Sequence, residues 1–261
     1  MGLTIHWQWK TDYSREQARE LTNKLYEYAA TLGFQHCFEP VEIDWSRPPA
    51  DSDEAFLRMR SHWTTHHEIE TGDGTPTSAG DLLEPAWSIC FFATDPGAEP
   101  VFIGFGEYPE TWKFRDEILP SGATGLSWMN WCKTQYASMP QEGGEPNFMA
   151  AHMRIVKLLD EVVRLGIPVE VIDEGEYWET RDEDQLLAKL RQYNGLIAAF
   201  TGHLKDRLGD EAVQAPIRDH PEFERLEAAG HAEFGAKFEQ GREAVEGMLE
   251  RSEDEPPAAT G

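Results

Sequence analysis

The sequence predicts an α+β fold, in which a mixed, largely antiparallel sheet is covered by helices and followed by a C-terminal helical extension. Leu3 to Trp9 alternates apolar and polar residues, as a strand does. Two apolar stretches between residues 87 and 106 follow each other without room for a helix, whereas long helical patterns begin after Ser14 and at Phe148. Helices and strands that alternate only in part are typical of this class.

The first third of the chain contains a clear helix start. Ser14 followed by Gln17 is a capping-box pattern, and Gly33 is a helix stop. Between them apolar residues recur at three- and four-residue spacing: Ala18, Leu21, Leu25, Tyr28 and Leu32. After this helix we expect a strand over His36–Trp45, a turn over Ser46–Asp51, a short helix over 53–67 and a loop over Thr71–Gly80.

The middle of the chain is predicted to be mainly strand. Trp87–Thr94 and Pro100–Gly106 flank Asp95-Pro96-Gly97, which indicates a hairpin. We expect a short helix near 110–118, a strand over Leu126–Ala137 and a loop over 140–146. The alternating aromatic residues between Leu126 and Ala137 are the basis for that strand.

The second half is predicted to be mainly helical. Phe148–Leu165 has one apolar side and ends before Gly166, and Asp182 begins a helix that reaches about Leu208. Between them we expect strands at Val169–Ile172 and Tyr177–Thr180 around a turn at Glu174-Gly175. Residues 1–210 then form one α+β domain, and 211–251 form an amphipathic helical extension that Gly230, Gly235 and Gly241 weaken. The acidic, Pro/Ala-rich residues 252–261 are predicted to be disordered.

The charge of the chain is strongly negative throughout. Asp and Glu number 48 against 23 Lys and Arg, the net charge is -25, and only 8 of the basic residues are Lys. A diffuse acidic surface is typical of a soluble protein that works in concentrated salt, where repulsion between carboxylates is screened. It argues against nucleic acid as a ligand, although mimicry of DNA is a less favoured alternative.

Targeting and redox signals indicate a cytoplasmic protein. No apolar run approaches the length that spans a bilayer, and the N-terminus lacks the features of a secretory signal. The three cysteines, Cys37, Cys90 and Cys132, are isolated and are predicted to be reduced. We therefore expect no membrane partner.

The densest histidine cluster is a candidate metal site. On the helix expected over 53–67, His62 and His66 would share one face, and Glu68 would add a carboxylate. The zincin pattern is incomplete, because Trp63 stands where that pattern has its glutamate. The alternative is that these are surface histidines. No cofactor follows from any motif, and a divalent metal is the one group that these residues would suit.

Two further stretches are candidates for chemistry. Acidic residues crowd the turn after residue 172, where they would bind a cation or act as acid and base; alternatively they form a polar turn on which Tyr177 and Trp178 pack. In the strand over Leu126–Ala137, Trp131 and Lys133 would share a face with Gln135, and mixed aromatic and polar faces suit a pocket wall as well as an edge strand. His152, near the start of its helix, would project toward Lys133 or be a buried core histidine.

The motifs Lys133-Thr134-Gln135-Tyr136-Ala137 and Asp173-Glu174-Gly175-x-Tyr177-Trp178-Glu179-Thr180, with His152 between them, resemble an uncharacterised family of prokaryotic proteins. The resemblance covers roughly residues 1–195 and leaves out the C-terminal extension; the insert at 138–146 departs from it. It implies no activity. It implies that one site is formed by Lys133, Gln135, His152, Asp173, Glu174 and Glu179.

Three functions follow as hypotheses. The first is a non-catalytic ligand- or protein-binding module, with Trp131, Tyr177 and Trp178 as binding residues and the C-terminal helix as the surface for a protein partner or self-association. The second is a metal-dependent hydrolase that uses the carboxylates and His152, with Lys133 as electrophilic stabiliser. The third is a metal site at His62, His66 and Glu68.

Overall fold

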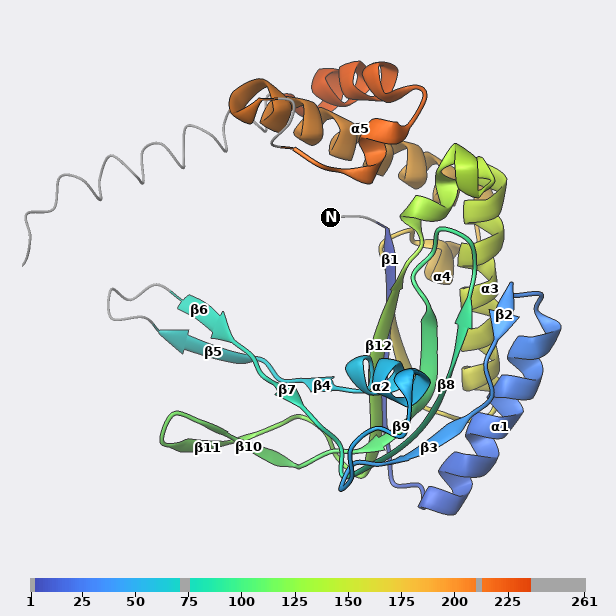
Figure 1. The fold of residues 1–261 in the computed structure, drawn as a ribbon, viewed down its shortest axis with the longest axis vertical. Helices are drawn as coiled ribbons and strands as arrows, with labels where there is room; N and C mark the ends of the chain where they lie inside the picture. Colours follow the sequence, from blue (N-terminus) through green and yellow to red (C-terminus); the bar gives the residue numbers. More distant parts are fainter. Residues whose placement is uncertain (1–2, 71–75, 210–212, 236–261) are drawn as a thin grey trace, which may run out of the picture. The chain divides into compact units, whose positions relative to one another are not determined.

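A computed structural model describes residues 3–70, 76–209 and 213–235 (Figure 1). The chain divides into two compact units, which we call the sheet unit (Leu3–Leu186) and the helical unit (from Leu187 onward). The division lies inside helix α5 (Glu183–Leu208), earlier than the boundary near residue 210 that we expected.

The sheet unit contains the antiparallel sheet that the sequence predicts, so the α+β class is confirmed. The strand order is β13-β1-β12-β9-β8-β2, and β3 also pairs with β8. The bounds of these strands are Thr4–Thr11 for β1, His36–Cys37 for β2, Val41–Asp44 for β3, Trp87–Thr94 for β8, Val101–Glu107 for β9, Leu126–Lys133 for β12 and Val169–Asp173 for β13. Strand β13 lies at the edge of the sheet, beside β1.

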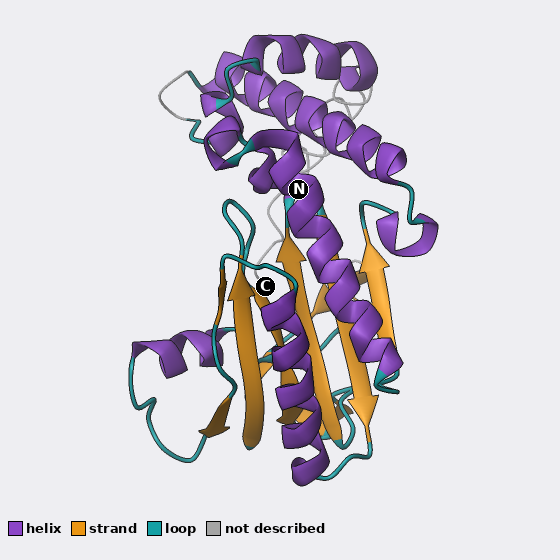
Figure 2. Ribbon diagram, turned by 90° about the vertical axis from the view of Figure 1, so that its right-hand side faces the viewer, coloured by secondary structure: helices purple, strands orange, loops and turns teal. Residues whose placement is uncertain are grey.

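Two long helices, α1 (Arg15–Thr31) and α3 (Gly144–Arg164), cover one face of the sheet (Figure 2). The capping box at Ser14 and Gln17 is present in both directions. The short helix α2 (Ser52–Met59) lies on the opposite face: Phe91 packs edge-on against Tyr26 of α1, whereas its neighbour Phe92 packs against Phe56 of α2. Strand β8 is therefore buried on both faces, which explains its continuous apolar sequence.

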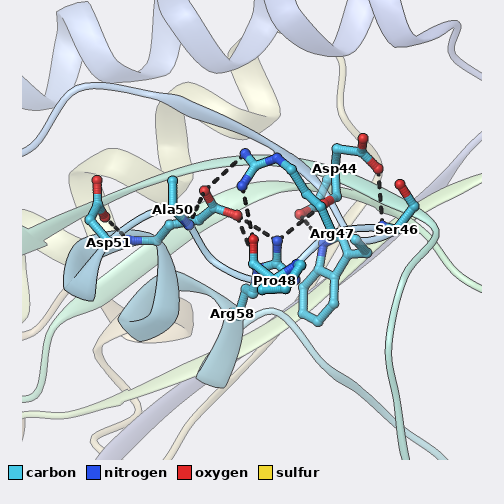
Figure 3. A network of polar contacts seen from close by, with 10 residues as sticks. Asp44, Ser46, Arg47, Pro48, Ala50, Asp51 and Arg58 are labelled. Atoms are coloured by element: carbon cyan, nitrogen blue, oxygen red, sulfur yellow. Dashed lines mark hydrogen bonds and ion pairs between the residues drawn. The ribbon is translucent and has the colours of Figure 1, made fainter.

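A buried ionic network holds α2 and the segment before it (Figure 3). The carboxylate of Glu54, 5% exposed, accepts hydrogen bonds from Arg58 at 2.5 Å, from Arg47 at 3.0 Å and from the backbone of Ala50 at 3.1 Å. Burial acts to raise the pKa of Glu54, but the guanidinium of Arg58, the backbone N–H of Ala50 and the guanidinium of Arg47 together outweigh it and hold the pKa below its ordinary value. Because Arg58 also donates to the carbonyl of Asp44 at 3.1 Å, the network ties α2 to the end of β3.

Helix α2 ends at Met59, so the helix expected over 53–67 is wrong in its second half. Beyond it, β4 (Trp63–Thr64) pairs with β7 (Leu82–Leu83), and β5 (His67–Glu70) pairs with β6 (Pro76–Ala79). Trp63 is 2% exposed and donates its indole N–H to the backbone of Ser121. This tertiary contact, together with the strand preference of Trp and Thr, overrides the helical spacing. Part of the loop expected over 71–80 is thus strand, and residues 71–75 lie outside the described part.

Three other expectations are corrected. Residues 110–118 form no helix but the hairpin of β10 (Thr111–Phe114) and β11 (Glu117–Pro120), because burial of Trp112 favours strand pairing. The expected strand over 36–45 is interrupted by Pro40, which lacks an N–H for pairing. Residues Tyr177–Thr180 form the one-turn helix α4, since the turn at Glu174-Gly175 turns the chain away from the sheet.

Two boundaries also differ from the prediction. Strand β12 stops at Lys133, and Gln135–Ser138 forms a 3₁₀ turn. Helix α3 begins at Gly144, so the end of the loop expected over 140–146 is its first turn.

The helical unit is built on α5, a 3₁₀ turn (Pro216–Asp219) and a helix over 223–235. Ile197, Ala198 and Ile217 form its core. A Cβ added to Gly230 would lie 2.0 Å from the backbone oxygen of Gly195, so this glycine permits close packing of two helices, a role that we did not expect. The remainder of the helix expected over 211–251, with Gly241, and the tail over 252–261 lie outside the described residues.

Candidate functional site

The motif over residues 173–180 meets helix α3 in the interior of the sheet unit. Asp173 ends β13 on the side of the sheet that α3 covers, and its Oδ2 lies 3.1 Å from Nε2 of His152. The carboxylate also accepts the backbone N–H of Gly175 at 2.8 Å and of Trp178 at 2.9 Å. Burial acts to raise the pKa of Asp173, but His152 and the two backbone donors outweigh burial and hold the pKa below its ordinary value. Asp173 is therefore an ionised, buried carboxylate.

Thr134 completes this cluster on the other side of the imidazole. Its Oγ1 lies 3.0 Å from Nδ1 of His152, and its backbone N–H donates to the carbonyl of Leu3 at 3.0 Å. Gln135, 1% exposed, accepts the N–H of Leu3 at 3.3 Å. These bonds join the start of β1, the end of β12, α3 and the end of β13.

The order Thr134–His152–Asp173 has the chemical types of a nucleophile, a base and an orienting acid. A nucleophile must contact its substrate, however, and Thr134 and His152 are each 0% exposed. Both imidazole nitrogens are already hydrogen-bonded inside the protein. The arrangement is suited to holding four chain segments together.

The other residues that we expected to form one site with His152 and Asp173 lie elsewhere. Lys133 directs its Nζ over the ring of Tyr136, 4.9 Å from the centroid, and Glu179 is exposed on α4. Glu174 follows Asp173 directly but turns to the opposite face of the sheet, where its Oε2 accepts the N–H of Thr4 at 2.9 Å. The structure thus brings together His152, Asp173 and, through Leu3, Gln135, and it separates Lys133, Glu174 and Glu179 from them.

The open face of the sheet unit, defined as the side of β13, β1 and β12 opposite α1 and α3, carries a second constellation. Strand pairing places Ile172, His6 and Trp131 in one row across the three strands. The next row consists of Glu170, Gln8 and Met129. Short α2 packs over β8 and leaves these rows accessible: Ile172 is 69% exposed and Trp131 36%.

A cavity of about 590 Å³ lies over these rows. Thr64 of β4 and His66 form one wall, and the rows themselves form the floor. The exposed surface of this lining is mostly apolar, as in sites for small molecules, although seven of the eleven described lining residues have polar side chains. The lining residues are His6, Trp7, Gln8, Thr64, His66, Met129, Asn130, Trp131, Glu170, Ile172 and Glu174.

Arg60 holds the indole of Trp131 in place. Its guanidinium lies 4.3 Å from the ring centroid, donates to the carbonyl of Trp131 at 3.0 Å and lies 3.7 Å from Glu99. The side-chain amide of Asn130 donates to the carbonyl of Arg60 at 2.6 Å. A large aromatic ring is therefore both partly exposed and held rigidly, which lowers the entropy cost of binding a ligand to it.

The two carboxylates at the cavity bond to uncharged groups. Glu170 accepts from the side-chain amide of Gln8 at 2.6 Å, and Glu174 accepts from the backbone of Thr4. Among the described residues neither has a cationic partner. Both therefore present negative charge to the cavity.

The histidine cluster is split by the end of α2. His62 lies 5.7 Å from the ring of Trp45 and 4.0 Å from Glu84, His66 lines the cavity, and Glu68 is exposed. The helical spacing that would have placed His62 and His66 on one face does not exist. In the part of the chain that the structure describes, no three His, Cys, Asp or Glu side chains are grouped to hold a metal ion.

Of the three predicted binding residues, only Trp131 lines the cavity. Tyr177 is 8% exposed and packs edge-on to His152, and Trp178 lies beneath Arg181 at 4.8 Å. Sequence reasoning missed His6, Gln8, Glu170 and Ile172. Their alternation along two strands was visible, but which strands are neighbours was not.

No family model, curated protein or solved structure matches this chain. The resemblance of its two motifs to a prokaryotic family therefore stays a prediction. Within the described residues, no helix has both the length and the apolar character needed to cross a membrane.

Proposed function

We propose that this protein is a non-catalytic binding module whose open sheet face holds a small organic ligand. The observation that carries this proposal is the partly exposed indole of Trp131, held by Arg60 at the floor of a cavity of about 590 Å³. Exposed apolar side chains that lie together and are rimmed by polar groups mark interaction sites. Met129 lies beside Trp131 on the same face of β12, and Ile172 adds an apolar side chain on the other side of His6.

The metal-dependent hydrolase is less well supported. That function would need the carboxylates, His152 and Lys133 around one reacting atom. His152 is enclosed on one side of the sheet, and Glu174 lies on the other. A protein partner for the C-terminal helix remains a separate prediction, since much of that segment lies outside the described residues.

The experiment is a ligand-observed NMR screen of small aromatic and aliphatic compounds against three proteins. The wild type is compared with Ile172→Asn, which changes the cavity floor, and with Ile118→Asn, which changes an equally exposed isoleucine on β11 (69% and 76% exposed). We expect compounds that bind the wild type and the Ile118 variant but lose binding to the Ile172 variant. Compounds that bind all three proteins equally, or an absence of binders to the wild type, would overturn the proposal.

A further inference from the structure

Building on the proposed function, we propose that the ligand of this cavity is an organic cation with a flat apolar body. Two features of the lining lead to this class of ligand. One is the formal charge of the side chains that line the cavity, and the other is the shape of its floor.

Among the described residues, the lining carries two formal negative charges and no Lys or Arg. Glu170 and Glu174 are the charged residues in this set when histidine is counted as neutral. Their hydrogen bonds to Gln8 and Thr4 orient the carboxylates without neutralising them. In a partly enclosed site such charges favour a cation and disfavour an anion.

The basic residues of the same sheet face are engaged elsewhere. Lys10 directs its Nζ over Trp63, 5.7 Å from the ring centroid, and Lys133 lies over Tyr136. Arg60 supports Trp131 from outside the lining and lies close to Glu99. None of these three cations lines the cavity, so none supplies a charge that would offset its two carboxylates.

The floor between the carboxylates is apolar in part: Ile172 and Trp131 lie on either side of His6 in one row, and Met129 lies beside Gln8 in the next. Glu170 lies in β13, two residues before Ile172, and Glu174 directly follows the strand, where its backbone N–H still donates to Thr4 of β1. Four residues of extended chain place the two Cα atoms about 13 Å apart. At that separation of the Cα atoms, one ammonium group contacts both carboxylates only if both glutamate side chains reach inward. Each end of the cavity therefore offers its own position for a cation. The body of the ligand would lie between them on Ile172, Met129 and the indole of Trp131, whose π face also attracts cations.

The test uses three soluble probes that share a phenyl ring: phenethylammonium, 2-phenylethanol and phenylacetate. Dissociation constants are measured in 0.1 M KCl by titrating ¹⁵N-tryptophan-labelled full-length protein and following the indole signal of Trp131, assigned with a Trp131→Phe variant. We expect phenethylammonium to bind about fivefold tighter than 2-phenylethanol, and phenylacetate to bind most weakly. The matched variants are Glu170→Gln with Glu174→Gln at the cavity, and Glu117→Gln on β11 as the control.

The outcomes separate the two proposals. Loss of the cation preference in the double variant, with 2-phenylethanol binding and melting temperature unchanged and the Glu117→Gln control like wild type, supports the cation site. Equal binding of the cation and the alcohol by the wild type overturns the cation site but leaves the binding function intact. If none of the probes shifts the Trp131 signal, both proposals are overturned for aromatic ligands of this size.

Discussion

The imidazole of His152 and the carboxylate of Asp173 lie 3.1 Å apart, and both side chains are 0% exposed. They join α3 to the end of the edge strand β13, one residue before Glu174 turns toward the open face. The buried pair therefore sets the position of one carboxylate of the cavity without touching the cavity itself.

Replacement of Asp173 by Asn should destabilise the protein strongly. The buried carboxylate lies within hydrogen-bond distance of His152 and accepts the backbone N–H groups of Gly175 and Trp178, and an amide in its place cannot satisfy all three. Because buried donors left without an acceptor are costly, the expected loss is about 3 kcal/mol in the free energy of unfolding. The control is Asp160→Asn, which breaks the ion pair with Arg181, whose side chains are 41% and 49% exposed; there we expect less than about 1 kcal/mol. Urea unfolding monitored by circular dichroism measures both. Similar losses in the two variants would mean that His152 and Asp173 do not form a stabilising pair.

The same pair predicts how stability depends on pH. The folded pKa of Asp173 lies below its ordinary value of 3.8, so the unfolded chain binds this proton more readily. Its contribution to stability is therefore complete above about pH 4 and is lost as the pH falls through the folded pKa. Urea midpoints between pH 2 and 7 at constant ionic strength should fall less steeply below pH 4 in Asp173→Asn than in the wild type. Parallel pH dependences of the urea midpoint in the two proteins would contradict a lowered pKa of Asp173 in the folded state.

Replacing either of two glycines in the helix over 223–235 by alanine should change the stability of the helical unit, with opposite signs at the two positions. A Cβ on Gly230 would lie 2.0 Å from the backbone oxygen of Gly195, whereas one on Gly235 meets nothing within 4 Å. We expect Gly230→Ala to destabilise the helical unit by roughly 1–3 kcal/mol through overpacking. Gly235→Ala should stabilise it by up to about 1 kcal/mol through helix propensity. Amide hydrogen exchange of residues 187–235 in the full chain reports both; the same sign for both changes would argue against the close contact.

The net charge of -25 predicts a steep dependence of stability on salt. Raising KCl from 0.1 to 1 M shortens the screening length from about 10 Å to about 3 Å, which weakens repulsion between surface carboxylates. The melting temperature should therefore rise over this range. Sucrose solutions serve as a non-ionic control. A melting temperature that does not change with KCl would remove the interpretation of the acidic surface as salt adaptation.

Much of the secondary structure was predictable because its signals are local. Ser14 and Gln17 form the capping box that their spacing indicated, and the hairpin around Asp95-Pro96-Gly97 is present as β8 and β9. The errors arose where tertiary contacts outweigh local preference. Trp63 and Trp112 are buried in short strands within segments whose spacing had suggested helices.

By itself, the sequence determined the α+β class, the two long helices over the sheet, the acidic character and Trp131 as a candidate binding residue. Only the tertiary structure decided which side chains share a surface. Ile172, His6 and Trp131 come from strands far apart in the chain, and they form one row because of strand order and register. A shift of one residue in that register would exchange the two faces, placing His6 toward α3 and Ile5 toward the cavity. Register is set by packing of the whole sheet against α1, α2 and α3, which no local pattern encodes.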